Sequence, residues 1–275
     1  MNNTIQINIA GINTDLQHVL IAELSSINFD AFEQKDNELD AFADENNFDE
    51  QVLIEVLKKH HVDFKKTIIP PQNWNELWES NFQPISVDDF CFIRADFHAP
   101  VAGMKHEIVI TPKMSFGTGH HPTTHAMIQQ MRDIDFENKS VADFGTGTGI
   151  LAIMAIKLGS KSVWAIDNDD WSIENATENI AKNNCQNISL EKKDEFGKGQ
   201  KFEVVLANIN RNVILENVKQ IAACMAAGST LLLSGLLKQD EEAVTDAFKP
   251  HNILQLNTLQ RGEWISIMLK HAISL

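Results

Sequence analysis

The chain has 275 residues, of which 43% are hydrophobic, and a formal net charge of −15 at pH 7. This length and hydrophobic content predict a globular protein with one large domain or two modest ones. The negative charge argues against binding to a nucleic-acid backbone, which requires a clustered surface of Lys and Arg.

The sequence also indicates the compartment. It contains no apolar run near the roughly 20 residues of a membrane span, and its first residues lack the basic and apolar parts of a secretory signal. Cys91, Cys185 and Cys224 form neither a CxxC pair nor a disulfide framework. We therefore expect a cytoplasmic protein. Its acidic surface either maintains solubility or steers a basic protein partner.

Residues 1–70 carry the pattern of a small domain. The predicted elements are a strand at 4–10, a helix capped at Thr14-Asp15, strands at 29–33 and 39–43, a helix from Asp49 and a strand at 62–69. This βαββαβ order is typical of a ferredoxin-like α+β domain. Because the segment holds no glycine loop and no cluster of catalytic residue types, we predict a role in recognition or scaffolding.

Residues 71–100 are predicted to form a linker, and residues 101–275 a second domain. The consecutive prolines at 70–71 mark the boundary. Trp74 and Trp78 lie four residues apart and predict an amphipathic helix that ends before Pro84. Two indole rings on one helix face favour packing between domains, and stacking on a ligand is the alternative.

A loop rich in Gly, Thr and His follows two predicted strands, at 90–97 and 106–111, and leads into a helix at 126–131. His121 and His125 have the spacing of zinc-binding helices. The sequence offers no glutamate between them and no third ligand, whereas zinc sites need at least three protein ligands. We therefore predict no metal site. Hydroxyl groups and free N–H groups at a helix start favour cofactor binding instead.

A second loop, from Asp143 to Gly149, places glycines at every second position between an apolar strand pattern and an apolar helix pattern that starts at Ile150. Glycine permits positive φ and leaves no Cβ between the backbone and a ligand. A dinucleotide fingerprint would need glycine where Ile150 stands, and a phosphate loop would need a lysine before Lys157. Neither common nucleotide motif therefore fits.

Two further strands are predicted to end at the same crevice. The strand at 161–167 ends in Asp167, about twenty residues beyond the glycines, where such folds place the acid that binds ribose hydroxyls. Asp167 is preferred to Asp169 because it ends the strand. The strand at 202–209 closes near Asn208. Ligands of open α/β sheets bind at the carboxyl ends of the strands, so we expect these side chains to face one site.

The remaining residues complete the sheet. The predicted elements are a helix that ends at 225–228, a buried strand at 230–235, a helix at 241–248 and hairpin strands at 253–259 and 264–270. Residues 192–199 are interpreted as a solvated loop. The second domain is therefore predicted to be a doubly wound α/β sheet with a C-terminal antiparallel hairpin.

Several of these motifs resemble one family. The pattern Asp-x-Gly-x-Gly-x-Gly from Asp143 resembles motif I of class I S-adenosylmethionine-dependent methyltransferases. The loop Phe116-Gly-Thr-Gly-x-His-Pro-Thr-Thr124 upstream of it resembles, more specifically, the methyltransferases of ribosomal protein L11. The Trp-x-x-x-Trp-x-x-Asn-Phe-x-Pro element at 74–84, the Ala-Asn-Ile after the fourth core strand and Glu263-Trp264 extend the likeness over essentially the whole chain.

The resemblance implies a Rossmann-like fold and S-adenosylmethionine as cofactor. It implies that the cofactor-binding residues are Phe116, Thr118, Thr124, Asp143, Gly145, Gly147, Asp167 and Asn208. Asn208, beside the methyl donor, is also the expected catalytic residue, because its side-chain carbonyl can accept a hydrogen bond from the acceptor amine. The chain has Asn208-Ile-Asn210 where enzymes that methylate amino groups of nucleic acids have Asn-Pro-Pro-Tyr. This difference argues against a nucleic-acid substrate.

The predicted function is methylation of lysine ε-amines, and of the N-terminal α-amine, of ribosomal protein L11 by a monomer whose residues 1–70 recognise the substrate. Two alternatives remain open. The chain could methylate another protein or a small amine through the same pocket. It could also be a non-catalytic adenosyl-ligand-binding module of ribosome assembly, which would keep the cofactor site and lose the acceptor pocket.

Overall fold

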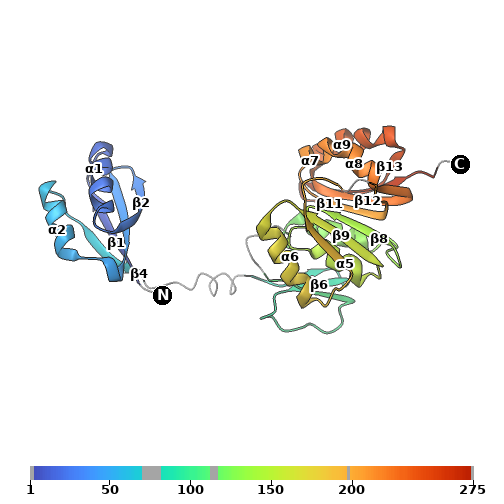
Figure 1. The fold of residues 1–275 in the computed structure, drawn as a ribbon, viewed down its shortest axis with the longest axis horizontal. Coiled ribbons are helices and arrows are strands. Elements are labelled where there is room, and N and C mark those ends of the chain that lie inside the picture. The colour runs from blue at the N-terminus through green and yellow to red at the C-terminus, as the bar shows by residue number, and fades with distance from the viewer. Residues whose placement is uncertain (1–2, 70–81, 112–116, 197–198, 274–275) are drawn as a thin grey trace. The chain divides into compact units, whose positions relative to one another are not determined.

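The computed structural model describes residues 3–69, 82–111, 117–196 and 199–273, and the chain divides into two compact units, Met1–Asn81 and Phe82–Leu275 (Figure 1). The border between the units falls within the predicted linker of residues 71–100. The predicted helix at Trp74 and Trp78, and the predicted site residue Phe116, lie outside the described residues. Each unit has its own hydrophobic core and is described by itself.

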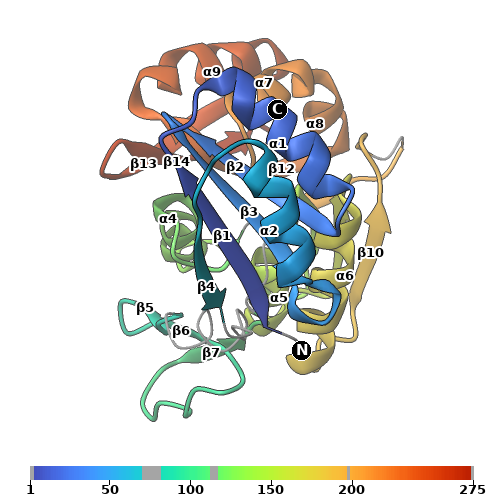
Figure 2. The same ribbon diagram turned by 90° about the vertical axis from the view of Figure 1, so that its left-hand side faces the viewer.

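The first unit is a four-stranded antiparallel sheet covered by two helices. Its elements are β1 (Thr4–Ala10), α1 (Thr14–Ser25), β2 (Phe29–Lys35), β3 (Glu38–Asp44), the 3-10 turn η1 (Glu45–Asn47), α2 (Glu50–Lys59) and β4 (Lys65–Ile69). The strand order β2-β3-β1-β4 is the ferredoxin-like arrangement that the sequence predicts. Figure 2 shows α1 and α2 side by side over the strands.

Alternation along β1 explains how this unit is held together. Ile5, Ile7 and Ile9 are buried on one face of the strand, whereas the residues between them are half-buried on the other. The three isoleucines pack against the apolar stripes of α1 and α2. Helix α1 begins one residue earlier than predicted, because Asn13 is the cap and its side chain accepts a hydrogen bond from the N–H of Leu16.

The second unit is built on a seven-stranded sheet in the order β10-β9-β8-β11-β12-β14-β13. Its strands are β8 (Ser140–Phe144), β9 (Ser162–Asp167), β10 (Ile188–Lys192), β11 (Phe202–Asn208), β12 (Met225–Leu237), β13 (Ile253–Arg261) and β14 (Trp264–His271). The first five in chain order are parallel, and β14 runs antiparallel to both of its neighbours. This topology confirms the predicted Rossmann-like sheet with a C-terminal hairpin.

Helices cover both faces of this sheet. The helices of one face are α4 (Pro122–Met131), α5 (Ile150–Lys157) and α6 (Asp170–Lys182), and those of the other are α7 (Arg211–Glu216), α8 (Val218–Cys224) and α9 (Glu241–Phe248), with the 3-10 turns η2 (Lys238–Asp240) and η3 (Lys249–His251) (Figure 1). Neighbouring strand residues such as Val141 and Ala142 belong to different cores, because successive side chains point to opposite faces. Among the described helices, none is long and apolar enough to cross a membrane.

One predicted boundary in this unit is wrong. The pattern Met-Ala-Ala-Gly predicts the end of a helix at 225–228, but α8 ends at Cys224 and Met225–Leu237 is a single strand. Met225 is fully buried and lies beside Phe202 of β11. Packing in the sheet therefore outweighs the helix propensity of this short segment.

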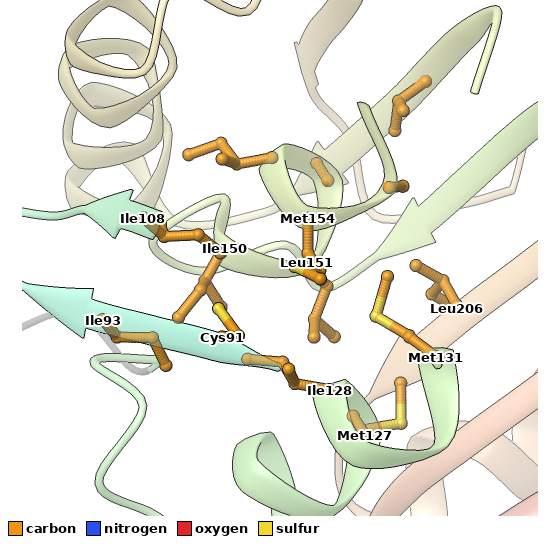
Figure 3. Close-up of a cluster of buried hydrophobic side chains, with 14 of the residues drawn as sticks. Cys91, Ile93, Ile108, Met127, Ile128, Met131, Ile150, Leu151, Met154 and Leu206 are labelled. Carbon is orange, nitrogen blue, oxygen red and sulfur yellow. The ribbon is translucent and has the colours of Figure 1, made fainter. Parts of the chain in front are cut away.

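A small three-stranded sheet precedes α4. Its strands are β5 (Ile85–Val87), β6 (Cys91–Arg94) and β7 (His106–Val109), in that spatial order. The sequence predicts β6 and β7, with longer bounds, and misses β5. Figure 3 shows Cys91 and Ile93 of β6 and Ile108 of β7 beside Ile150, the first residue of α5. This apolar contact places the small sheet against the helix that follows the glycine turn.

Candidate functional site

A cavity of about 480 Å³ lies at the carboxyl edge of the seven-stranded sheet, where the strand order reverses. Four of the predicted site residues line it, namely Gly145, Gly147, Asp167 and Asn208. They come from the carboxyl ends of β8, β9 and β11 or from the turns that follow, as expected for a topological switch point. The cavity has the volume typical of a cofactor site.

The glycine turn owes its shape to positive φ angles. Gly145 has φ +70° and Gly147 has φ +55°, and a Cβ on Gly145 would lie 2.3 Å from Cγ2 of Ile209. Side chains other than hydrogen would therefore displace the segment after β11. The turn ends at Gly149, which precedes the first turn of α5. Backbone groups of the turn can thus lie directly against a ligand.

Asp143 lies beneath this turn and does not line the cavity. Its side chain is fully buried, and its Oδ2 accepts a hydrogen bond from the hydroxyl of Thr146 over 2.6 Å. Burial raises the pKa of the Asp143 carboxyl to about 7, because the charged form loses its hydration. Asp143 therefore affects the cavity only indirectly, through the glycine turn that it supports.

Asp167 is tied to the glycine turn as well as to its own strand. Its Oδ2 accepts a hydrogen bond from the N–H of Gly147 over 2.9 Å, and its Oδ1 accepts one from the N–H of Asp169 over 3.1 Å. Asp169, the alternative candidate, caps α6 instead, because its carboxylate accepts from the N–H of Ser172. Of these two carboxylates, Asp167 is therefore the one that lines the cavity.

Asn208 lines the cavity, and the carbonyl oxygen of its side chain is buried. Its Nδ2 donates to the hydroxyl of Thr124, with 3.3 Å between the two atoms, and Thr124 is itself fully buried on α4. Among the described residues, Oδ1 of Asn208 is buried and has no hydrogen-bond partner. A buried acceptor without a partner is costly, so a donor from a bound molecule fits this position.

The other predicted residues lie further from the cavity. Thr124 contributes through Asn208 and is absent from the described cavity wall. Thr118 is half-exposed, and its hydroxyl is 3.3 Å from Nδ1 of His120. The structure therefore brings the glycine turn, Asp167, Asn208 and Thr124 together and leaves Thr118 outside this group.

The cavity also contains residues that the sequence interpretation did not assign to it. His121 caps α4, since its Nδ1 accepts from the N–H of Thr123, and its ring centroid lies 4.7 Å from that of Trp264. Both rings line the cavity. Burial lowers the pKa of His121, which favours the neutral imidazole near pH 7. Gly235 of β12 lines it too, at a point where a Cβ would lie 2.2 Å from the carbonyl oxygen of Ile209.

The interpretation of residues 192–199 as a solvated loop is incomplete. Lys193 and Asp194 line the cavity, and Phe196 is buried with its ring centroid 4.0 Å from that of Phe144. The position of this segment in the sequence could have indicated its place at the cavity, because it directly follows β10 and the carboxyl ends of parallel strands share one edge of the sheet.

In the described part of the chain, no three His, Cys, Asp or Glu side chains are grouped so as to hold a metal ion.

The arrangement fits an adenosyl cofactor and an amine. The carboxylate of Asp167 at the end of β9 can accept hydrogen bonds from a vicinal diol, and the glycine turn lets a ligand lie against the backbone. The buried side-chain carbonyl of Asn208 can accept a hydrogen bond from an N–H donor. The rings of His121, the cap of α4, and of Trp264, the first residue of β14, line the same cavity. The cavity therefore offers groups that suit a cofactor and groups that suit an acceptor amine.

Comparison with known proteins gives one consistent result. A family model described as Ribosomal protein L11 methyltransferase (PrmA) matches residues 5–272. The ribosomal protein L11 methyltransferase of Phocaeicola vulgatus is 36% identical over 93% of this chain and 94% of its own length. The protein of the same name from Chlorobaculum tepidum is 34% identical, over 94% of each chain.

Two solved structures are similar in fold. The crystal structure of a ribosomal protein L11 methylase from Lactobacillus delbrueckii subsp. bulgaricus matches with a TM-score of 0.65 and 28% identity, over 70% of this chain and 100% of that one. A methyltransferase from Pyrococcus furiosus matches with a TM-score of 0.52 and 16% identity, over 60% of this chain and 90% of that one. The second likeness concerns the fold alone.

Proposed function

Because this chain belongs to the ribosomal protein L11 methyltransferase family, we propose that it methylates lysine ε-amines and the N-terminal α-amine of ribosomal protein L11. S-adenosylmethionine is the methyl donor of this family and fold. When bound, it supplies an electrophilic methyl group on a sulfonium. The kind of amine that accepts this group is our inference from the site.

The cofactor side of the cavity is assigned first. We place the ribose hydroxyls at Asp167, whose carboxylate is held by the N–H of Gly147, and the methionine part against Gly145 and Gly147. Thr124 acts by orienting the amide of Asn208, and Asp143 by supporting the turn through Thr146. Phe116 and Thr118 complete the proposed set on the strength of the loop motif that they share with the family.

One observation carries the choice of acceptor. Asn208 lines the cavity, and its Oδ1 is buried without a hydrogen-bond partner among the described residues. A neutral amine can donate an N–H to this oxygen, and the donation aims the nitrogen lone pair into the cavity. The NH₂ group of the same amide donates to the hydroxyl of Thr124. Asn208 is therefore proposed as the catalytic residue.

The amine must first lose its proton. A lysine side chain has an ordinary pKa near 10.4 and an α-amine one near 8, so both are largely protonated at pH 7. Loss of hydration in the cavity and the positive charge of the bound cofactor both disfavour the protonated amine, and so lower the pKa of the amine. The neutral His121 and the indole of Trp264 carry no charge that would stabilise the protonated amine, and the amine releases its proton to solvent.

The decisive experiment is mass spectrometry of purified ribosomal protein L11 after incubation with this protein and S-adenosylmethionine. We expect mass gains in whole methyl steps, which fragmentation places on lysine side chains and on the α-amine. Asp167→Ala is the control, and it should show little gain because cofactor binding is weakened. Modification of other residue types would overturn the proposed acceptor.

Absence of any gain, with S-adenosylmethionine binding measured by calorimetry, would remove L11 as the substrate. The cofactor site would still stand in that case. The same two measurements separate the open alternatives, because another methyltransferase would bind the cofactor and modify a different acceptor. A non-catalytic module would bind it and modify none.

A further inference from the structure

Two asparagines of α6, and Asn183 at its C-terminal cap, bond to the backbone of β7 and of the residues that follow it. Asn183 accepts from the N–H of Val109 through Oδ1 and donates to its carbonyl through Nδ2, over 3.0 and 2.6 Å. One helical turn earlier, Oδ1 of Asn179 accepts from the N–H of Thr111 over 2.7 Å, and Asn175 donates to the carbonyl of Thr111 over 3.2 Å. The spacing of four residues places all three amides on one helix face.

Asn179 differs from Asn183 because it also reaches the glycine turn. Its Nδ2 donates to the carbonyl of Thr148 over 2.9 Å and to Oδ1 of Asn175 over 3.0 Å. Both asparagines, 175 and 179, are completely buried. Two fully buried amides with several hydrogen bonds each form a rigid connection, because every alternative arrangement leaves a polar group unsatisfied.

Thr148 continues the connection to the loop before α4. Its hydroxyl donates to the carbonyl of Gly117 over 2.6 Å, and its side chain is fully buried. The approach is close, since a Cβ on Gly117, which has φ +102°, would lie 2.9 Å from Oγ1 of Thr148. The backbone of the loop is thus fastened directly to the turn that lines the cavity.

The loop fastened in this way leads into α4, and the loop and the helix each carry one residue of the site. His121, four residues after Gly117, lines the cavity, and Thr124 bonds to Asn208. The hydroxyl of Thr148 and the amide of Asn179 touch neither the cavity nor Asn208 in the described structure. Their effect on a ligand must therefore act through the loop and the turn.

We propose that Thr148 and Asn179 are positioning residues that fasten residues 117–121 to the glycine turn and thereby set His121 and Thr124 against the cofactor site. Asn179 holds the carbonyl of Thr148, and Thr148 holds the carbonyl of Gly117. Loss of either bond leaves a buried carbonyl without a partner and lets the loop move away from the turn. The enzymatic part of this inference rests on the proposed function, whereas its binding part needs only the cofactor.

The first test compares Thr148→Val with Thr148→Ser. Valine has the shape of threonine without the hydroxyl, and serine keeps the hydroxyl. Binding of S-adenosylmethionine to the full chain is measured by calorimetry without any protein substrate. We expect a dissociation constant roughly tenfold higher for Thr148→Val, the equivalent of one lost hydrogen bond to a buried group, and rescue to within about twofold for Thr148→Ser.

Hydrogen exchange gives a readout that does not depend on the ligand. Backbone amides of residues 117–131 should exchange faster in Thr148→Val than in the wild type and in Thr148→Ser. A purely structural role would lower global stability in Thr148→Val without a local increase in that segment. Equal cofactor affinity and equal local exchange in the two variants would overturn the inference.

The second test compares Asn179→Ala with Asn183→Ala. Both variants remove an amide that bonds to the backbone of the same strand region, but only Asn179 bonds to the glycine turn. We expect weaker cofactor binding, by about tenfold, in Asn179→Ala and unchanged binding in Asn183→Ala. A similar change in both variants would show that general loosening of α6 explains the effect.

This pair also keeps the question decidable if Thr148→Val fails to fold. The proposed function and the positioning inference can fail separately. If the wild type binds S-adenosylmethionine and leaves L11 unmodified, the proposed substrate is wrong and the comparison of binding constants still applies. The opposite case is that the wild type methylates L11, while the variants Thr148→Val and Asn179→Ala both bind the cofactor as tightly as the wild type does. The positioning inference is then wrong and the proposed function stands.

Discussion

Asn208 is the residue on which the proposed chemistry depends most directly. Its carbonyl oxygen is buried at the cavity and has no partner among the described residues. Asn208→Ala removes the acceptor for the amine, so we expect kcat to fall by roughly a hundredfold, the usual size for one preorganised hydrogen bond. The dissociation constant for S-adenosylmethionine should change by less than about threefold, since Asp167 and the glycine turn are retained.

The measurement is steady-state methylation of L11 together with calorimetry. Thr124→Val is the matched variant, because it removes the hydroxyl that accepts from Asn208 and leaves the carbonyl in place. Its kcat should fall less than that of Asn208→Ala. Full turnover by Asn208→Ala would remove Asn208 from the catalytic role.

Asp143 makes the stability of the protein depend on pH. The folded pKa is about 7, above the ordinary value of 3.8, because the carboxyl is fully buried. The folded state therefore binds more protons than the unfolded state between about pH 4 and 7, and the free energy of unfolding falls as pH rises through this window. Above the folded pKa, the free energy of unfolding falls no further on account of Asp143.

Asp143→Asn is neutral at every pH, and its amide can still accept from Thr146. We expect the wild type to lose stability relative to this variant by up to about 4 kcal/mol between pH 4 and pH 8, following the shift of roughly three pH units. Urea unfolding of both proteins at several pH values measures the difference. A difference that stays constant across this range would contradict the assignment of a protonated Asp143.

Some site residues could be predicted because their signals are local in the sequence. The glycines and Asp167 follow apolar strand patterns directly, and Asn208 ends a strand of the same kind. The contact between His121 and Trp264 could not be derived in this way, because 143 positions separate two residues that meet only after the sheet has formed. The family likeness drew attention to both motifs without placing the two rings in one cavity.

At the scale of elements, the end of β12 constrains the segment after β11. Gly235 has φ +81°, and a Cβ on it would lie 2.2 Å from the carbonyl oxygen of Ile209, next to Asn208. Gly235→Ala should therefore lower the free energy of unfolding by about 3 kcal/mol or more, through overpacking as well as backbone strain. It should also lower kcat, because displacement of Ile209 moves Asn208.

Gly262→Ala is the control for this prediction. Gly262 lies in the turn between β13 and β14 with φ +62°, and no atom lies within 4 Å of a Cβ built there. This variant has only the cost of a left-handed backbone, about 1–2 kcal/mol, and leaves kcat unchanged. Urea unfolding measures both variants, and equal losses would show that contact with Ile209 is unimportant.

Element types were largely predictable, whereas several boundaries were not. Alternation in β1 and the apolar pattern of α5 reflect burial directly, so their residues reveal the structure. The strand β5 has three residues and no pattern that such a short segment could express. The segment Met225–Gly228 has a helical composition, and its place beside β11 is a tertiary effect.

At the scale of the whole molecule, the two units predict separable functions. The cavity and its lining residues all belong to Phe82–Leu275, and the first unit has a separate core. A protein that comprises residues 82–275 should therefore bind S-adenosylmethionine with nearly the affinity of the full chain. We expect it to lose most methylation of L11, because residues 1–70 are proposed to recognise this substrate.

Calorimetry and mass spectrometry of the truncated and full chains measure these two properties. Methylation of L11 by residues 82–275 at the rate of the full chain would show that recognition resides in the second unit. The sequence predicts two domains because the double proline and the change from a βαββαβ pattern to a glycine-rich α/β pattern are both visible in the chain. It assigns no residue contact to recognition, since such contacts involve a partner outside the chain.

Asn175 and Asn179 of α6, together with Asn183 at its end, have a further consequence for the small sheet. β7 is the last strand of the small sheet: one side pairs with β6, and the other side has no neighbouring strand among the described residues. An open edge is a template on which a second chain can add a strand and begin to aggregate. Here the outward N–H and carbonyl groups of Val109 and Thr111 already bond to side-chain amides of the same molecule. The helix thus occupies the place of the missing neighbouring strand and protects this edge against self-association.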